Sequence, residues 1–366
     1  MTVRVGVLVN PIAGFGGMLA LHGTDQLPAD RFEEAAQANR AGRRMTQALD
    51  AFLRAGVEAE LVQAPGLLGA EHPAIGARTT RDDTIAAARD LLAGGVDVLL
   101  FAGGDGTATD IAEAIGTRMP VIGIPSGVKM HSEVFSRSPV AAGRLLADFV
   151  RGHAPSELAD VLDVGADGVS GVVGTLLAPR SSEVLQGAKS SAPAGSSAAA
   201  GRAIARDLVA GAPDGVTWVI GPGTTAGAVA EELGLAPTLR GVDVRHPSGE
   251  VERDVTEDRL HVVAGEAGHP RLVLGVVGGQ GFLLGRGNQQ LSARVIEAIG
   301  VENIDIVATP EKVGALQPPV LLVDVDEPTA LVGYRRVRTG FRTSIVLKVV
   351  DAAAQPESVQ KVGERR

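Results

Sequence analysis

A short apolar run that ends in glycines constrains the fold of this chain more than any other feature. Residues 96–102 are apolar except for Asp97 and have the length of a buried strand. The sequence Gly-Gly-Asp-Gly-Thr follows at residues 103–107, and residues 108–115 then have a helical pattern. A strand, a glycine-rich turn and a helix in this order are typical of parallel α/β sheets, which bind ligands at the carboxyl ends of their strands.

The first 150 residues alternate between strand and helix patterns, whereas the later strand-like runs are shorter and more widely separated. We therefore predict an α/β nucleotide-binding domain with a parallel sheet over residues 1–155 and a β-rich C-terminal domain over residues 156–366. The early strands are expected at residues 3–10, 57–62, 96–102 and 120–124, with helices at residues 43–54 and 81–92.

Composition excludes several classes of protein. The 366 residues include no cysteine, which removes disulfides, thiolate metal sites and cysteine nucleophiles. A net charge of −9 argues against a general nucleic-acid or anionic-membrane binder. We find neither a signal-peptide pattern nor an apolar run as long as a membrane span, so we expect a cytoplasmic protein without nucleic-acid or membrane partners.

The loop at residues 103–107 is the strongest chemical signal. Its three glycines allow the backbone to approach a ligand closely, and the N–H groups at the helix start favour an anion. Asp105 would repel a phosphate, which suggests a metal ligand or a base that takes a proton from an attacking hydroxyl. The alternative is a glycine turn in which Asp105 caps the helix.

A second loop, residues 123–132, also leaves a predicted buried strand. Lys129 could neutralise phosphate charge, and Ser126 or Ser132 could hold a ribose or phosphate oxygen. His131 is a candidate for acid–base chemistry, although a lone histidine is more often a packed or capping residue.

Two further glycine-rich loops lie in the second half. Residues 221–227 place two threonine hydroxyls at a helix start. Residues 278–290 combine five glycines with Arg286, which suits a phosphate, and with side-chain amides, which suit base edges or sugar hydroxyls. The alternative for the latter loop is a solvated turn cluster. Four such loops in one chain favour a nucleotide ligand, while Walker A, zinc, serine-elbow and dinucleotide-fingerprint patterns are absent from the sequence.

The motifs at residues 9–14, 103–107, 123–132 and 278–292 together resemble the ATP-NAD kinase family, in particular its AcoX-like branch within the NAD kinase and diacylglycerol kinase-like superfamily. Phosphofructokinases, diacylglycerol kinases and sphingosine kinases share the Gly-Gly-Asp-Gly-Thr loop, whereas the block at residues 279–292 is more specific to this branch. The resemblance extends from about Val3 to Tyr334.

This resemblance implies an NAD kinase-like fold with the active site between the domains. It implies transfer of the γ-phosphate of ATP, or of another nucleoside triphosphate, to the adenosine-ribose 2′-hydroxyl of NAD, with Mg²⁺ as cofactor. Asp105 corresponds to the catalytic residue at the reacting hydroxyl and to a possible Mg²⁺ ligand, and a homo-oligomer (dimer or tetramer) is expected. The residues expected to contact nucleotides are Asn10, Gly14, Gly103, Gly104, Gly106, Thr107, Ser126, Gly127, Lys129, His131, Gly223, Thr224, Thr225, Gly279, Gln280, Gly281, Arg286, Asn288 and Gln289.

The sequence departs from the family pattern where the acceptor would bind. The region of residues 160–168 lacks the asparagine of the Asn-acid pair that holds a ribose in NAD kinases, and residues 19–29 are also altered. Two alternatives therefore remain. The first is a kinase of the same fold with another acceptor, such as a nucleoside, a polyol or, with less support, a lipid alcohol. The second is a non-catalytic nucleotide-binding regulatory protein.

Overall fold

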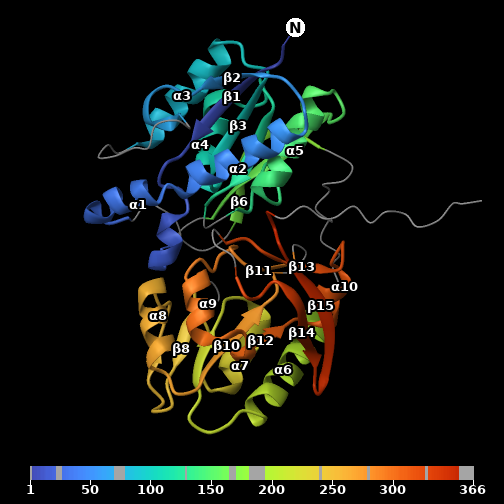
Figure 1. Cartoon of the computed structure of the whole chain (residues 1–366). Helices are drawn as coiled ribbons and strands as arrows, with labels where there is room; N and C mark the ends of the chain where they lie inside the picture. The colour runs from blue at the N-terminus through green and yellow to red at the C-terminus, as the bar shows by residue number, and fades with distance from the viewer. Residues whose placement is uncertain are drawn as a thin grey trace, which may run out of the picture.

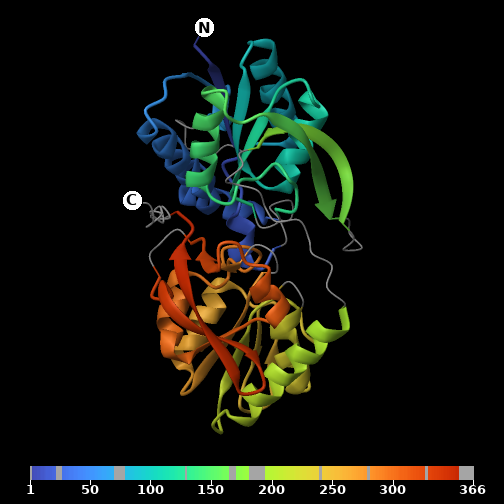
Figure 2. The same cartoon turned by 90° about the vertical axis from the view of Figure 1, so that its right-hand side faces the viewer.

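The computed structural model describes residues 2–21, 27–69, 79–127, 130–164, 170–180, 194–238, 241–277, 281–325 and 329–353. These residues form two units, one above the other in Figures 1 and 2, with the first half of the chain in the upper unit. No helix in the described ranges combines the length and the apolar character needed to cross a membrane.

The first unit contains a parallel four-stranded sheet. Its strands occur in the order β2-β1-β3-β4, and all neighbouring pairs are parallel. This confirms the predicted α/β domain with a parallel sheet. The strands are β1 (Arg4–Val9), β2 (Glu60–Gln63), β3 (Val98–Gly103) and β4 (Val121–Pro125). Because Val9 pairs with Ala102 and Gly103 pairs with Pro125, β1, β3 and β4 end at one edge of the sheet.

Helices cover both faces of this sheet, and strand side chains alternate between the two cores. Val5 and Val7 pack with α2 (Arg40–Arg54) and α5 (Pro139–Val150), whereas Leu99 and Phe101 pack with α3 (Arg81–Ala93) and α4 (Asp105–Ile115). The shorter helices of this unit are η1 (Phe15–Leu19), η2 (Ala29–Arg31), α1 (Phe32–Ala38) and η3 (Gly66–Leu68).

An antiparallel hairpin extends the first unit beyond the predicted boundary. It consists of β5 (Ser156–Val164) and β6 (Ser170–Pro179), and it lies along the first unit in Figure 2. Ala159 and Val161 are fully buried in the core that includes Ile111 of α4. The predicted boundary at residue 156 therefore falls just before a hairpin that buries its apolar face against the first unit.

The second unit is built on a nine-stranded mixed sheet of order β11-β13-β15-β14-β12-β10-β7-β8-β9, which confirms the predicted β-rich second part of the chain. Its strands are β7 (Thr217–Ile220), β8 (Asp243–Arg245), β9 (Val251–Glu252), β10 (Pro270–Gly275), β11 (Phe282–Leu284), β12 (Ile304–Val307), β13 (Val320–Val323), β14 (Gly333–Gly340) and β15 (Thr343–Asp351).

Helices also cover both faces of the second sheet. Side chains of α6 (Ala194–Ala210) and α7 (Thr224–Glu232) pack on one face, and those of α8 (Glu257–Glu266) and α9 (Ala293–Ile299) pack on the other. The short helices η4 (Val301–Asn303) and α10 (Pro310–Gly314) flank β12. The strands β7, β10 and β12 are parallel, so the loops that follow them lie at one edge of the sheet.

Candidate active site

Three predicted loops of the first unit meet at the carboxyl edge of its sheet. The side-chain amide of Asn10, after β1, donates to Thr107 Oγ1 at 3.1 Å. The carbonyl oxygen of Gly103, at the end of β3, accepts hydrogen bonds from the backbone N–H groups of Ser126 (2.9 Å) and Gly127 (3.0 Å). The structure thus brings together candidate residues from all three loops.

Glycine is required at two positions in these loops. Gly14 has a φ of +87°, and a Cβ there would lie 2.1 Å from the carbonyl oxygen of Ser126. A Cβ on Gly103 would lie 2.5 Å from Thr107 Oγ1. Gly106, by contrast, is exposed in the first turn of α4, and a Cβ there would meet no atom of the described residues within 4 Å. The loops therefore pack tightly on one another while leaving space beside Gly106.

Asp105 begins α4, and its side chain is buried. One carboxylate oxygen, Oδ1, accepts hydrogen bonds from Ser132 N at 3.0 Å and from Ser132 Oγ at 2.6 Å. The other, Oδ2, accepts from His131 N at 2.8 Å and lies 3.2 Å from His131 Nδ1. Burial alone would raise the pKa of Asp105, but the hydrogen bonds from His131 and Ser132 outweigh it and hold this pKa below its ordinary value.

The hydrogen bonds to the Asp105 carboxylate affect its predicted role as a Mg²⁺ ligand. Each carboxylate oxygen already has at least two partners within the protein, and Mg²⁺ requires free oxygen lone pairs. Across the described ranges, no group of three or more histidine, aspartate or glutamate side chains could hold a metal ion. The residues present therefore do not fit a direct Mg²⁺ site at Asp105.

His131 and its neighbours lie at the junction with the second unit. The His131 side chain is 47% exposed, although Asp105 beside it is buried. Met130 Sδ accepts a hydrogen bond from Arg286 Nη1 of the second unit at 2.9 Å. Lys129, which was predicted to contact phosphate, lies outside the described residues.

Arg286 was predicted to bind phosphate, and the structure places it in the contact between the units. Its Nη2 donates to the carbonyl oxygen of Arg137 at 2.6 Å, and its guanidinium lies 4.5 Å from the centroid of the Phe282 ring. Burial lowers the pKa of Arg286 to about 10, so the guanidinium stays charged at neutral pH. A free nucleotide phosphate would have to compete with these contacts.

A buried ion pair joins the two units beside Arg286. Arg44 of α2 binds the Asp324 carboxylate with both Nη atoms, one at 3.1 Å, and both side chains are buried. Arg286 Nη2 lies 3.4 Å from Asp324 Oδ2. Gly285 approaches this aspartate so closely that a Cβ would lie 1.9 Å from the Asp324 carbonyl oxygen. Sequence reasoning missed Arg44 and Asp324, which are 280 positions apart and carry no local motif.

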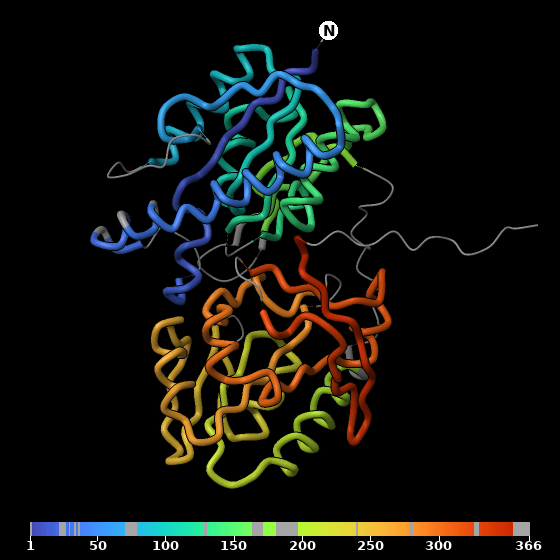
Figure 3. Tube along the Cα trace, viewed as in Figure 1, coloured from blue at the N-terminus to red at the C-terminus, as the bar shows by residue number. Residues whose placement is uncertain are grey.

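The amide side chains of the loop at residues 278–290 have different roles. Asn288 closes its own turn, because Oδ1 accepts from Gly285 N at 2.9 Å and Nδ2 donates to Leu283 O at 2.7 Å. Gln289 Nε2 instead donates across the junction to Gly127 O at 3.3 Å. The trace through residues 281–292, orange at the top of the lower unit in Figure 3, faces the first unit. Of the remaining predicted residues of this loop, Gly281 has a φ of +75°, and Gly279 and Gln280 lie outside the described residues.

Lys312, which sequence reasoning did not single out, contacts the loop before α7. Gly223 precedes α7 with a φ of +102°, Thr224 is exposed and Thr225 is buried. Lys312 Nζ, from α10, donates to Thr225 Oγ1 at 3.0 Å and to Val276 O at 3.3 Å. Burial lowers the pKa of Lys312. An ammonium group has three donors, and acceptors in the described residues take two of them.

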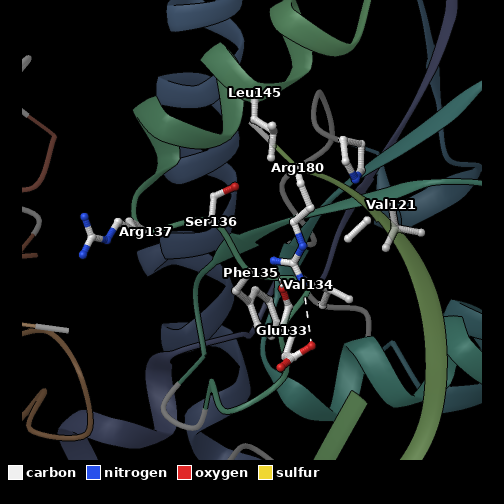
Figure 4. Close-up of a pocket in the computed structure, with 10 residues that line it drawn as sticks. Val121, Glu133, Val134, Phe135, Ser136, Arg137, Leu145 and Arg180 are labelled. Atoms are coloured by element: carbon white, nitrogen blue, oxygen red, sulfur yellow. Dashed lines mark hydrogen bonds and ion pairs between the residues drawn. The ribbon is translucent and has the colours of Figure 1, made fainter. Parts of the chain in front are cut away.

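Two cavities lie apart from these loops. The first, shown in Figure 4, has a volume of about 20 Å³, room for about one water molecule. In that view Arg137 points away from the other lining side chains. The second, of about 400 Å³, lies at the amino ends of β10 and β12 and is lined by polar residues such as Arg271 and Asp305. Neither is lined by the predicted glycine-rich loops.

Residues 5–154 match the family model of the ATP-NAD kinase N-terminal domain. This match covers the four-stranded sheet and the Gly-Gly-Asp-Gly-Thr loop, and it confirms the family resemblance for the first unit. No protein in the curated set matches the chain.

Three solved structures are remotely similar to the chain. One is "a putative diacylglycerol kinase" from Bacillus anthracis str. Sterne, with 18% identity and a TM-score of 0.25 over 42% of this chain and 44% of that one. A second structure under the same description has 17% identity, a TM-score of 0.25 and 42% coverage of each chain. A conserved domain protein from Vibrio cholerae has 12% identity and a TM-score of 0.27 over 86% of this chain and 77% of that one. The chain spans less than half the length of the Bacillus anthracis proteins that it matches.

Proposed function

We propose that this chain transfers a phosphoryl group from a nucleoside triphosphate, most simply ATP, to the adenosine-ribose 2′-hydroxyl of NAD. The ATP-NAD kinase N-terminal domain supports phosphoryl transfer to a hydroxyl group. The choice of NAD as the acceptor is the more specific part of the proposal. Part of the region in which we expect the acceptor to bind, residues 165–168, lies outside the described residues.

The open space beside Gly106 is the observation that carries the proposal. A glycine in the middle of a helix costs about 0.5–1 kcal/mol relative to alanine. At Gly106, in the first turn of α4, no atom of the described residues lies where a Cβ would require glycine. At Gly14 and Gly103, close contacts within the protein account for the glycine. A ligand that approaches the backbone closely would account for glycine at position 106. The N–H groups at the start of α4 suit an anionic partner such as a phosphate.

A second phosphate contact is proposed at the loop before α7. Gly223, Thr224 and Thr225 precede or begin a helix, and Lys312 adds a positive charge beside Thr225. Phosphoryl transfer depends mainly on positioning and on neutralising charge, which backbone N–H groups and a lysine supply. The hydrogen bonds from Gln289 and Arg286 to the first unit would then hold the two phosphate-binding regions in a fixed relation.

The test is product analysis with the full chain, Mg²⁺, ATP and a panel of acceptors: NAD, NADH, a nucleoside and a polyol. The expected result is NAD that gains one phosphoryl group, with an equal amount of ADP formed. Asp105→Asn should lose this activity, whereas Asp305→Asn, which alters a carboxylate between two arginines outside the site, should retain it.

Two other outcomes would change the proposed acceptor or contradict the proposed phosphoryl transfer. Phosphorylation of the nucleoside or polyol alone would replace NAD as acceptor but keep the kinase. Nucleotide binding without any ADP formation would support the regulatory alternative and contradict the proposed function.

A further inference from the structure

Asp105 and His131 form a carboxylate–imidazole pair whose two members differ in exposure. Asp105 is 3% exposed and its carboxylate is fixed by hydrogen bonds from the backbone and the hydroxyl of Ser132. The His131 ring is 47% exposed and contacts the carboxylate through Nδ1 at 3.2 Å. A buried carboxylate that positions a half-exposed imidazole is the arrangement that enzymes use for general base catalysis.

The geometry fixes which ring nitrogen is available. The hydrogen bonds to Asp105 favour its ionised form, and an ionised carboxylate only accepts hydrogen bonds. The proton of neutral His131 therefore lies on Nδ1, and Nε2 on the other side of the ring has a free lone pair. Asp105 itself has no oxygen without a partner and is a weak base because of its lowered pKa.

The backbone around His131 also places this ring at the proposed site. The N–H groups of His131 and Ser132 both donate to Asp105, and the Ser132 hydroxyl accepts from Leu162 N at 3.0 Å. The loop is thus tied to α4 and to β5. Met130, one residue earlier, contacts Arg286 of the second unit. The ring is therefore held in place at the junction where the proposed substrates would meet.

We infer that His131, not Asp105, is the proton acceptor of the reaction, and that Asp105 is the residue that positions it. The inference rests on the proposed phosphoryl transfer. In the step, the acceptor hydroxyl oxygen forms a bond to the γ-phosphorus of the donor, the bond from that phosphorus to the β,γ-bridging oxygen breaks, and ADP leaves. The hydroxyl proton passes to His131 Nε2, and the negative charge of Asp105 stabilises the resulting imidazolium.

Kinetics of His131 variants test the inference on whichever acceptor the wild-type chain phosphorylates. His131→Gln should lower kcat by about 10²–10⁴-fold, the usual contribution of a general base, with the KM of both substrates within about threefold of wild type. Added imidazole should restore part of the rate of His131→Ala. The matched control is His246→Gln, which removes the imidazole that contacts Glu252 in the second unit and should leave kcat unchanged.

A double-mutant cycle separates the two assignments. If Asp105 acts through His131, the variant with both Asp105→Asn and His131→Gln should be no slower than His131→Gln alone. If Asp105 is the base, the double variant should be much slower than His131→Gln. That result, or a His131→Gln rate within threefold of wild type, would overturn the inference while leaving the kinase intact.

A spectroscopic measurement adds a readout that does not depend on turnover. In ¹⁵N-histidine-labelled protein, the signals lost in His131→Gln should report a proton on Nδ1, and Asp105→Asn should change them. A proton on Nε2 in the wild type would contradict the inference. If the wild type phosphorylates no acceptor in the panel, the proposed function fails and the inference fails with it.

Discussion

Replacing Gly106 with alanine distinguishes a glycine that faces a ligand from one that the fold requires. Gly106 lies in the first turn of α4, and a Cβ there would meet nothing within 4 Å. In the absence of ligand, alanine should therefore raise the free energy of unfolding by about 0.4–1 kcal/mol, because it restricts the unfolded chain and favours the helix.

The effect on activity should have the opposite sign. If a phosphate or hydroxyl of the substrates contacts the Gly106 backbone, the added methyl group displaces it by about 1 Å, and such a misplacement costs on the order of 100-fold in rate. Gly106→Ala should then be more stable than wild type, with kcat/KM reduced about 100-fold. Urea denaturation and steady-state ADP release measure the two quantities.

Gly265 provides the matched control. It is also exposed within a helix, α8, and a Cβ there would meet nothing within 4 Å. Gly265→Ala should stabilise the chain to a similar degree without changing the rate. Wild-type activity in Gly106→Ala would refute the ligand-facing assignment, and a loss of stability would show that the fold itself requires this glycine.

Three further predictions concern charged side chains. Asp324→Asn leaves Arg44 buried without its counter-charge, so unfolding free energy should fall by about 3–5 kcal/mol and hydrogen exchange at the junction should rise; unchanged exchange would refute a joining role. Lys312→Met should weaken ATP binding measured by calorimetry at least tenfold, and equal affinity would exclude Lys312 from the phosphate site. The hydrogen bond from Arg259 lowers the pKa of Glu252 to about 2 from an ordinary 4.5, so its stabilising contribution is complete above pH 4.5 and is lost as pH falls toward 2. Glu252→Gln should flatten the acid-denaturation curve over that range, and an unchanged curve would contradict the assignment.

The fold of the first unit could be predicted because its signals are local. An apolar run, a glycine-rich turn and a capped helix occur within a few residues of one another, as at residues 96–115. The glycine loops were also placed at the correct edge of the sheet, since strands in a parallel sheet end on the same side. The packing of the hairpin β5–β6 on the first unit could not be predicted, because strand alternation is the same whichever unit covers its apolar face.

Contacts between distant segments could not be predicted. The interpretation of Asp105 as a base or metal ligand followed from its loop, but its partners His131 and Ser132 come from a loop 26 residues later. Arg286 was expected to meet phosphate because it lies among glycines, and only the folded chain shows that Phe282 and Arg137 surround it. A single sequence gives the composition of a loop but not what packs against it.

Phosphorus-31 NMR of the full chain mixed with NAD, ATP and Mg²⁺ tests the central claim most directly. The account predicts that the γ-phosphate signal of ATP declines while a phosphomonoester signal of the NAD 2′-phosphate appears in equal amount, and that His131→Gln slows both changes together. An ATP spectrum that stays unchanged while a calorimetric titration shows nucleotide binding would contradict it, because the chain would then bind its nucleotide without transferring phosphate.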